Sequence, residues 1–93
     1  MVVVITKNLV KEREKYLSLA KAFVEDARTD KGCHDMEVCM DSEKEDEVVF
    51  ISKWESKDDF LNHVHGPSFA KHIPGMSVYY VSGTDEIFEI INI

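Results

Sequence analysis

The sequence predicts an α+β fold in which helices cover one face of a four-stranded sheet. Strand-like and helix-like segments follow one another in the order β-α-β-β-α-β. The first and third expected strands are apolar on both faces, as central strands are, whereas the second alternates like an edge strand. Central first and third strands correspond to the 4-1-3-2 antiparallel sheet of the ferredoxin-like fold, in a single domain over residues 1–93.

The first half of the chain supplies two strands and a long helix. A strand is expected over residues 2–7 and a helix over residues 11–28, because apolar residues recur there at helical spacing. That apolar stripe consists of Tyr16, Ala20, Phe23, Val24 and Ala27. Gly32 follows where a left-handed residue can stop a helix. Residues 34–40 then alternate between apolar and polar side chains, which indicates a half-exposed edge strand.

The second half begins with an acidic turn over residues 41–46 and a third strand over residues 47–54. Ser56 is the expected N-cap of the next helix, since an acidic residue, Asp59, stands three positions later. Gly66-Pro67 should break that helix, and Pro67 is well placed to start a second short one.

Pro74-Gly75 should end this second helix. Residues 78–93 are expected to be extended, with a turn over residues 82–85 and a last strand over residues 87–93.

Composition narrows the range of functions. With 18 acidic against 11 basic residues and a net charge of −7, the chain lacks the basic face that nucleic acids or anionic membranes require. No segment is long and apolar enough for a membrane helix, and the N-terminus does not resemble a signal peptide, so a cytoplasmic location is expected. Cys33 and Cys39 are expected to be free, as two thiols in an untargeted chain usually are, and their spacing does not suit a metal site.

One face of the predicted sheet has no helix in this chain to cover it. That face must pack against another sheet or bury a ligand. A 93-residue chain also buries little surface by itself, so association with an identical chain is the expected way to gain burial. We therefore expect a homodimer in which two sheets form a dimeric α/β barrel.

His63 is the leading candidate for chemistry. A histidine exchanges protons near neutral pH, and this one lies on the same helix side as Phe60, towards the sheet edge. A histidine packed at a helix–sheet seam is the alternative. Asn8, at the end of the first strand, could bind a substrate oxygen or dioxygen, or merely cap the following helix.

Aromatic residues near His63 are candidates for substrate binding. Trp54, at the end of the third strand, would form a pocket wall, although core packing is the more common role of a strand tryptophan. Phe60 is expected beside His63, and Phe69 and His72 share a face of the following short helix.

No metal or cofactor motif is present. The spacing of His63, His65 and His72 does not suit a metal site, and the chain has no phosphate-binding glycine loop. No metal and no organic cofactor are therefore expected. If the protein is an enzyme, its substrate must supply the electrons.

The order of elements and the segment Trp54-Glu55-Ser56-x-x-x-Phe60-x-x-His63 resemble the antibiotic biosynthesis monooxygenase (ABM) domain family. Gly66-Pro67-Ser68-Phe69 matches the short segment that follows in the family. The resemblance implies a dimeric α+β barrel and a cofactor-independent monooxygenase acting on a small aromatic or quinol substrate with dioxygen. In that scheme His63 assists ionisation of the substrate, Asn8 binds oxygen and Trp54 packs the pocket.

Another branch of the family degrades heme, and it gives an alternative. Asn8 matches the asparagine of that branch. His63, however, stands where its tryptophan is expected, and the heme-ligand position falls near Ile73, one residue from His72. A third reading is a non-catalytic dimer that binds a small ligand, because the same fold also serves that role.

Overall fold

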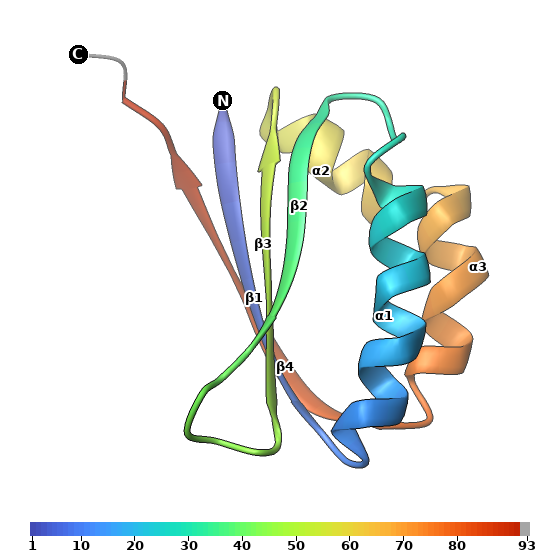
Figure 1. The fold of residues 1–93 in the computed structure, drawn as a ribbon. Helices are drawn as coiled ribbons and strands as arrows, with labels where there is room; N and C mark the ends of the chain where they lie inside the picture. The colour runs from blue at the N-terminus through green and yellow to red at the C-terminus, as the bar shows by residue number, and fades with distance from the viewer. Residues whose placement is uncertain (92–93) are drawn as a thin grey trace.

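The computed structural model describes residues 1–91 and contains seven elements around one sheet (Figure 1). They are β1 (Val2–Val10), α1 (Arg13–Ala27), β2 (Cys33–Met40), β3 (Glu47–Trp54), α2 (Lys57–Val64), α3 (Pro67–Met76) and β4 (Tyr80–Glu89). The strands pair antiparallel in the order β2-β3-β1-β4. The predicted ferredoxin-like fold is confirmed, with the first and third strands central and the second at an edge.

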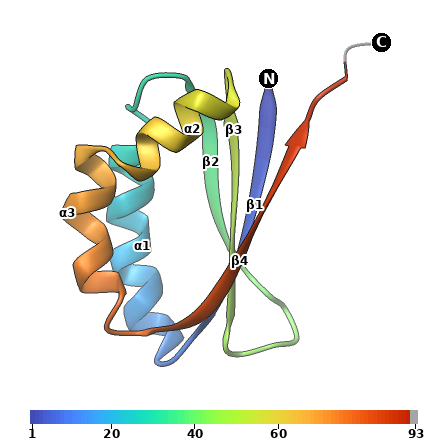
Figure 2. The ribbon, with the colours of Figure 1, turned by 180° about the vertical axis from the view of Figure 1, so that it is seen from behind.

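The three helices all lie on one face of the sheet, which both ribbon views show (Figures 1 and 2). Alternate residues of the two central strands point to these helices and are buried. They are Val2, Val4, Asn8 and Val10 of β1, and Val48, Phe50, Ser52 and Trp54 of β3. The opposite face carries apolar side chains that are only half-buried or exposed in the single chain, among them Val3, Ile5, Val49 and Ile51.

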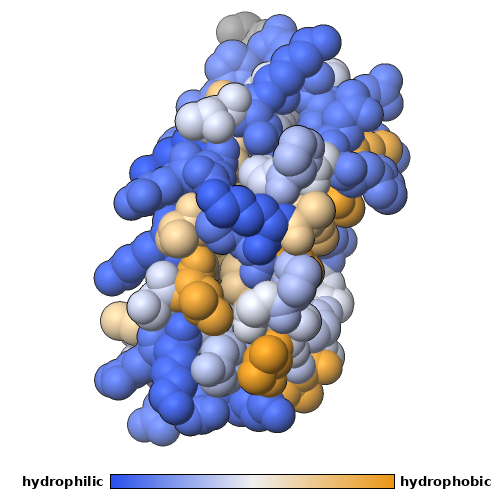
Figure 3. Space-filling model, turned by 90° about the vertical axis from the view of Figure 1, so that its right-hand side faces the viewer, coloured by the Kyte–Doolittle hydropathy of each residue, from blue (hydrophilic) through white to orange (hydrophobic). Residues whose placement is uncertain are grey.

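The helix α1 presents its predicted apolar stripe to the sheet. All five stripe residues, Tyr16, Ala20, Phe23, Val24 and Ala27, are buried. On its flank α1 packs against α3. The side of the molecule where α1 and α3 lie is mostly hydrophilic, with only scattered hydrophobic side chains (Figure 3). This helical layer is therefore suited to face solvent.

The start of α2 is capped as predicted. The Ser56 hydroxyl oxygen accepts a hydrogen bond from the Asp59 backbone N–H at 3.1 Å and donates to the Asp59 carboxylate at 3.1 Å. This cap fixes α2 directly after Trp54, the last residue of β3. Because of that short connection, the first turns of α2 lie over the end of the sheet.

The structure lacks two interruptions that the sequence predicts, a helix end at Pro74-Gly75 and a turn over residues 82–85. The helix α3 does not end at Pro74-Gly75 but continues to Met76, where the backbone N–H of Ser77 bonds to the Ile73 carbonyl. The Ser77 hydroxyl also donates to the Pro74 carbonyl at 2.7 Å. A proline this close to a helix end removes one internal hydrogen bond, and the capping bonds offset part of that loss.

The expected turn over residues 82–85 is likewise wrong. This segment lies inside β4, where Ser82, Gly83, Thr84 and Asp85 pair with Leu9, Asn8, Lys7 and Thr6 of β1. Tertiary pairing with a central strand outweighs the local turn preference of these residues. The irregularity falls instead between Leu9 and Val10, where the register shifts. The strand predicted over residues 87–93 is the last part of β4, which ends at Glu89, and residues 92–93 lie outside the described part of the chain.

Gly32 occupies the sharpest point of the connection between α1 and β2. Its φ is +81°, a conformation that L side chains rarely adopt, and its carbonyl accepts a hydrogen bond from the Glu55 N–H at 2.8 Å. A Cβ at this position would also overlap the Asp59 side chain. Glycine is therefore required here by both conformation and space.

We expect the substitution Gly32→Ala to lower the free energy of unfolding by about 1–3 kcal/mol, the range for a non-glycine residue held in such a conformation. Equilibrium denaturation in urea measures this change. Gly75→Ala is the matched control, because a Cβ at Gly75 meets nothing within 4 Å. Equal stability of Gly32→Ala and the wild type would contradict the expected strain.

Candidate functional site

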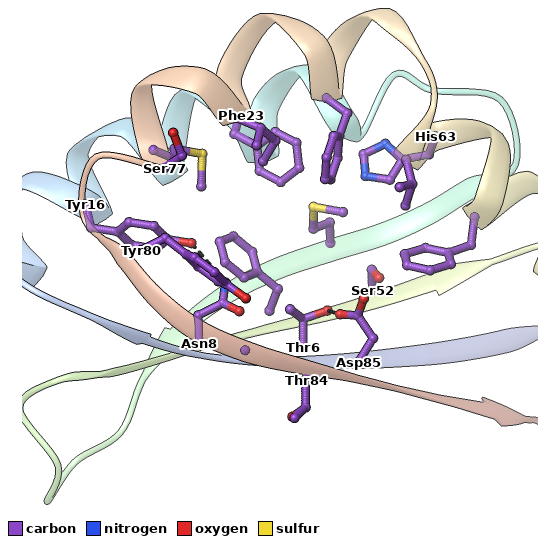
Figure 4. A pocket seen from close by; sticks show the side chains of 18 residues that line it. Thr6, Asn8, Tyr16, Phe23, Ser52, His63, Ser77, Tyr80, Thr84 and Asp85 are labelled. Atoms are coloured by element: carbon purple, nitrogen blue, oxygen red, sulfur yellow. Dashed lines mark hydrogen bonds between the residues drawn. The ribbon is translucent and has the colours of Figure 1, made fainter.

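A cavity of about 440 Å³ lies between the helices and the sheet face that they cover (Figure 4). Most of its wall is apolar, with contributions from all three helices and from β2 and β3. Representative members are Phe23, Met36, Phe50, Phe60, Phe69 and Ile73. Asn8, Tyr16 and Tyr80 gather at one end of the cavity, His63 and Ser52 lie towards the other, and Thr6 and Asp85 stand on the sheet side between them (Figure 4). The lining therefore suits a ligand that is largely apolar and carries a few polar groups.

His63 projects from α2 into the second end of this cavity. Its ring is 5.7 Å from the Phe23 ring and 4.7 Å from the Trp54 ring, measured between centroids. Its Nδ1 atom is 2.6 Å from a carboxylate oxygen of Asp30, in the connection between α1 and β2. The residue is 5% exposed in total. His63 is therefore both packed at a helix–sheet seam and present in the cavity wall.

The Nε2 atom of His63 contacts the cavity. Within residues 1–91 no protein group is hydrogen-bonded to Nε2, yet no fully buried side-chain nitrogen or oxygen in that range lacks a partner. The atom must therefore touch open space, and His63 lines the cavity. An imidazole nitrogen in this position can exchange a proton with a bound molecule.

Asn8 lies at the other end of the cavity, on the face of β1 that the alternation predicts. It is 8% exposed and does not end the strand, which continues to Val10. Its Nδ2 atom donates a hydrogen bond to the Tyr16 hydroxyl at 3.0 Å. Its Oδ1 atom has no hydrogen-bond partner in the described chain and, by the same reasoning, contacts the cavity. The carbonyl oxygen of Asn8 is thus available to a donor on a ligand.

Tyr16 is an un-ionised neighbour of Asn8. Burial raises the pKa of the Tyr16 hydroxyl, the hydrogen bond from Asn8 lowers it in part, and the nearby Tyr80 raises it. The phenol is therefore neutral at ordinary pH and keeps its proton for hydrogen bonding.

The other predicted site residues divide into two groups. Phe60 and Phe69 line the cavity. Trp54 has no exposed surface, and its ring packs against that of His63. Its Nε1–H donates a hydrogen bond to the Ser52 hydroxyl at 2.9 Å. Trp54 thus packs in the core, the alternative to a pocket wall. His72 is not among the lining residues. Its Nε2 atom is hydrogen-bonded to Asp26 of α1, and this bond lowers the pKa of the Asp26 carboxyl group.

The contributions of β4 and of Asp30 to the cavity cannot be predicted from local sequence patterns. Tyr80, Gly83 and Asp85 line the cavity, and the Asp85 carboxylate accepts a hydrogen bond from the Thr6 hydroxyl at 2.6 Å. These residues were assigned to an extended segment and a turn, and only the pairing of β4 with β1 brings them to the site. No local sequence signal identifies Asp30, which is 33 residues from His63.

Other classes of site receive no support from the described structure. Within residues 1–91, no three His, Cys, Asp or Glu side chains are grouped in a way that could hold a metal ion. Both cysteines are free thiols, with Cys33 partly buried and Cys39 exposed. None of the helices in this range is long and apolar enough to cross a membrane.

The sheet order and the cavity define a ferredoxin-like α+β domain with a pocket between helices and sheet. A sequence profile for "antibiotic biosynthesis monooxygenase" matches residues 1–74, and the chain therefore belongs to this family. No functionally curated protein matches the chain significantly.

Solved structures share the fold over almost the whole chain. One described as an antibiotic biosynthesis monooxygenase is 21% identical, with a TM-score of 0.87 and coverage of 99% of this chain and 100% of the other. A conserved protein from Methanosarcina mazei is 21% identical, with a TM-score of 0.84 and coverage of 94% and 89%. SnoaB from Streptomyces nogalater, a cofactor-independent oxygenase, is 15% identical, with a TM-score of 0.86 and coverage of 99% and 94%. At these identities the likeness demonstrates the fold.

Gly83 leaves room for the polar end of the cavity. A Cβ at this position would overlap Asn8 Oδ1 and would lie 2.9 Å from the Tyr80 hydroxyl and 3.1 Å from the Lys7 carbonyl oxygen. The Lys7 carbonyl is backbone in a central strand and cannot move easily. The absence of a side chain at Gly83 is therefore part of the geometry of the site.

We expect Gly83→Ala to displace the Asn8 side chain and to lower the free energy of unfolding by about 1–3 kcal/mol, as overpacking does. The side-chain amide resonances of Asn8 in a ¹H–¹⁵N correlation spectrum report the displacement, and urea denaturation reports the stability. Gly75→Ala, in open space, should leave those resonances unchanged. Unmoved Asn8 resonances in Gly83→Ala would contradict this account.

Proposed function

We propose that the protein is a cofactor-independent monooxygenase that oxidises a small aromatic or quinol substrate with dioxygen. The observation that carries this proposal is the apolar cavity with an imidazole nitrogen, His63 Nε2, at one end and a carboxamide oxygen, Asn8 Oδ1, at the other. Membership of the ABM family supports it. So does the description of SnoaB, which shares the fold, as a cofactor-independent oxygenase.

The reaction begins with removal of a proton from the bound phenol or quinol by His63 Nε2. The resulting anion is rich in electrons and reduces dioxygen directly. One oxygen atom enters the product and the other leaves as water, with every electron supplied by the substrate. The protein contributes a positioned base and a cavity that excludes water from the reactive anion.

The remaining residues of the site position the reactants. Phe60 and Phe69 provide flat apolar surfaces for an aromatic ring. Asn8 binds a hydroxyl group of the substrate or a protonated oxygen species, because its free atom is a hydrogen-bond acceptor. Trp54 packs against the His63 ring and helps to hold it in place. His72 has no place in this mechanism, since its ring nitrogen is held by Asp26 outside the cavity.

The substitution His63→Ala should lower quinol-dependent oxygen uptake by about 10²-fold, the lower end of what a positioned base contributes. An oxygen electrode and a panel of hydroquinones and anthrone-type phenols measure the rate. His34→Ala is the matched control, because His34 is an exposed histidine that also bonds to a carboxylate, Glu55. Circular dichroism checks folding. Uptake that is unchanged in His63→Ala would remove His63 from the mechanism.

Titration with heme separates this proposal from heme degradation. A defined Soret band that bleaches with ascorbate under air would favour the heme-degrading branch. Of the histidines in the described chain, only His63 lines the cavity, and His72, one residue from the ligand position of that branch, turns to Asp26. His72 would therefore have to give up its bond to Asp26 before it could bind a heme iron. Tight binding of a phenol without oxygen uptake would favour the third reading, a ligand-binding dimer.

The proposal includes a homodimer that covers the open face of the sheet. This face carries Ile51 at 41% exposure, Leu9 at 40% and Phe88 at 47%, beside the half-buried Val3 and Ile5. All five residues point away from the helices: Val3, Ile5, Leu9 and Ile51 alternate with the buried residues of their strands, and Phe88 pairs with Val3. An identical face on a second chain would remove these apolar side chains from water.

The substitution Ile51→Glu should convert the dimer to a monomer, because it would bury a charge at the centre of the interface. Light scattering coupled to size-exclusion chromatography measures the mass. Leu61→Glu is the matched control, since Leu61 has a similar exposure of 39% but lies on α2, on the helical side. A monomeric wild type, or an Ile51→Glu variant that remains dimeric, would contradict this interface.

A further inference from the structure

The position of Asp30 gives it a specific role at the cavity. We propose that Asp30 is a positioning residue that holds the proton of neutral His63 on Nδ1, so that Nε2 presents its lone pair to the cavity. The catalytic consequence rests on the monooxygenase function proposed above. The protonation pattern itself concerns the free protein and is testable without any substrate.

Side chains from two helices, α2 and α3, contact one carboxylate oxygen of Asp30. Its Oδ2 atom accepts a hydrogen bond from the Ser68 hydroxyl at 2.5 Å and lies 2.6 Å from His63 Nδ1. Asp30 lies between α1 and β2, His63 belongs to α2, and Ser68 stands in the first turn of α3. An ionised carboxylate only accepts hydrogen bonds, so the proton of the short contact with His63 must reside on Nδ1.

The His63 ring cannot adopt another orientation without losing this bond. Phe69 and Phe23 each lie 5.7 Å from it, Phe60 lies 6.2 Å from it, and Trp54 lies at 4.7 Å, all between ring centroids. The side chain of His63 is 2% exposed. Rotation of the ring by half a turn would place a carbon atom against Asp30 and leave the carboxylate without its partner.

This arrangement opposes the intrinsic preference of the ring. A neutral imidazole in water favours the tautomer with its proton on Nε2, and that form would direct an N–H group into the cavity. Such a group could donate a hydrogen bond to a phenol but could not take its proton. Asp30 selects the tautomer that can act as a base and then stabilises the imidazolium that forms, as the carboxylate of a catalytic triad does.

A second histidine–carboxylate pair in the same protein provides an internal reference. His72 bonds to Asp26 through Nε2 and not through Nδ1, and it does not line the cavity. By the same argument, neutral His72 carries its proton on Nε2. The two pairs therefore predict opposite tautomers for His63 and His72 in one molecule.

Long-range ¹H–¹⁵N correlation spectra of the imidazole rings test the proposal at mildly alkaline pH. In the wild type we expect the Nδ1–H form for His63 and the Nε2–H form for His72. In Asp30→Ala, His63 should shift to the Nε2–H form while His72 stays unchanged. In the control variant Asp26→Ala, His63 should keep the wild-type form.

Two spectral results would overturn the proposal. One is a wild-type His63 with its proton on Nε2, or with protons on both nitrogens. The other is a folded Asp30→Ala variant in which His63 keeps the Nδ1–H form. If Asp30→Ala does not fold, the wild-type spectrum alone tests the proposal.

A kinetic measurement tests the catalytic consequence separately. Asp30→Ala should lower the kcat of quinol-dependent oxygen uptake by about 10-fold or more with little change in KM, because ligand contacts remain while the base is lost. Asp30→Glu, which restores a carboxylate, should recover part of the rate. A wild-type kcat in Asp30→Ala would refute the catalytic role. A wild type that consumes no oxygen would refute the proposed function and leave the tautomer to be judged by the spectra.

Discussion

The presence of apolar residues on both faces of the two central strands is the constraint on which the rest of this structure depends. β1 and β3 place apolar residues on alternate sides, and a single layer of helices covers only one of them. On the covered side, a cavity remains between the helices and the sheet. On the other side, residues such as Ile5 and Ile51 stand opposite each other with only partial cover. The ligand site and the proposed dimer surface therefore use opposite faces of the same two strands.

The charge balance of the cavity limits the chemistry that it can support. Among residues 1–91 no lysine or arginine lines the cavity, and Asp85 is present in its wall. In the proposed mechanism, the imidazolium of His63 would be the one cation of this lining close to the substrate anion. The charge would thus remain paired within the site, and the anion would be short-lived unless dioxygen consumed it. Such a site favours reactions in which proton removal and electron transfer follow closely.

Local signals made much of this fold predictable. The stripe of α1 and the Ser56 cap depend on residues a few positions apart, and both are as expected. β4 was less predictable, because Gly83 and its neighbours have turn preferences that only pairing with β1 overrides. The same holds for the site. His63, Asn8 and the phenylalanines could be proposed from motif and alternation, but the bond between Asp30 and His63 joins residues far apart in the chain.

The pairing of β1 with β4 also determines when the site can form. Among the described elements β1 comes first and β4 last, and the two pair side by side, with β4 at the edge of the sheet. A chain emerging from a ribosome can therefore build α1, β2 and β3 while one side of β1 remains without hydrogen-bond partners. Contacts between distant parts of a chain form slowly, because closing the intervening loop costs conformational entropy. Since Asn8 and Gly83 meet only across this pairing, the polar end of the cavity is completed only after β4 has been synthesised.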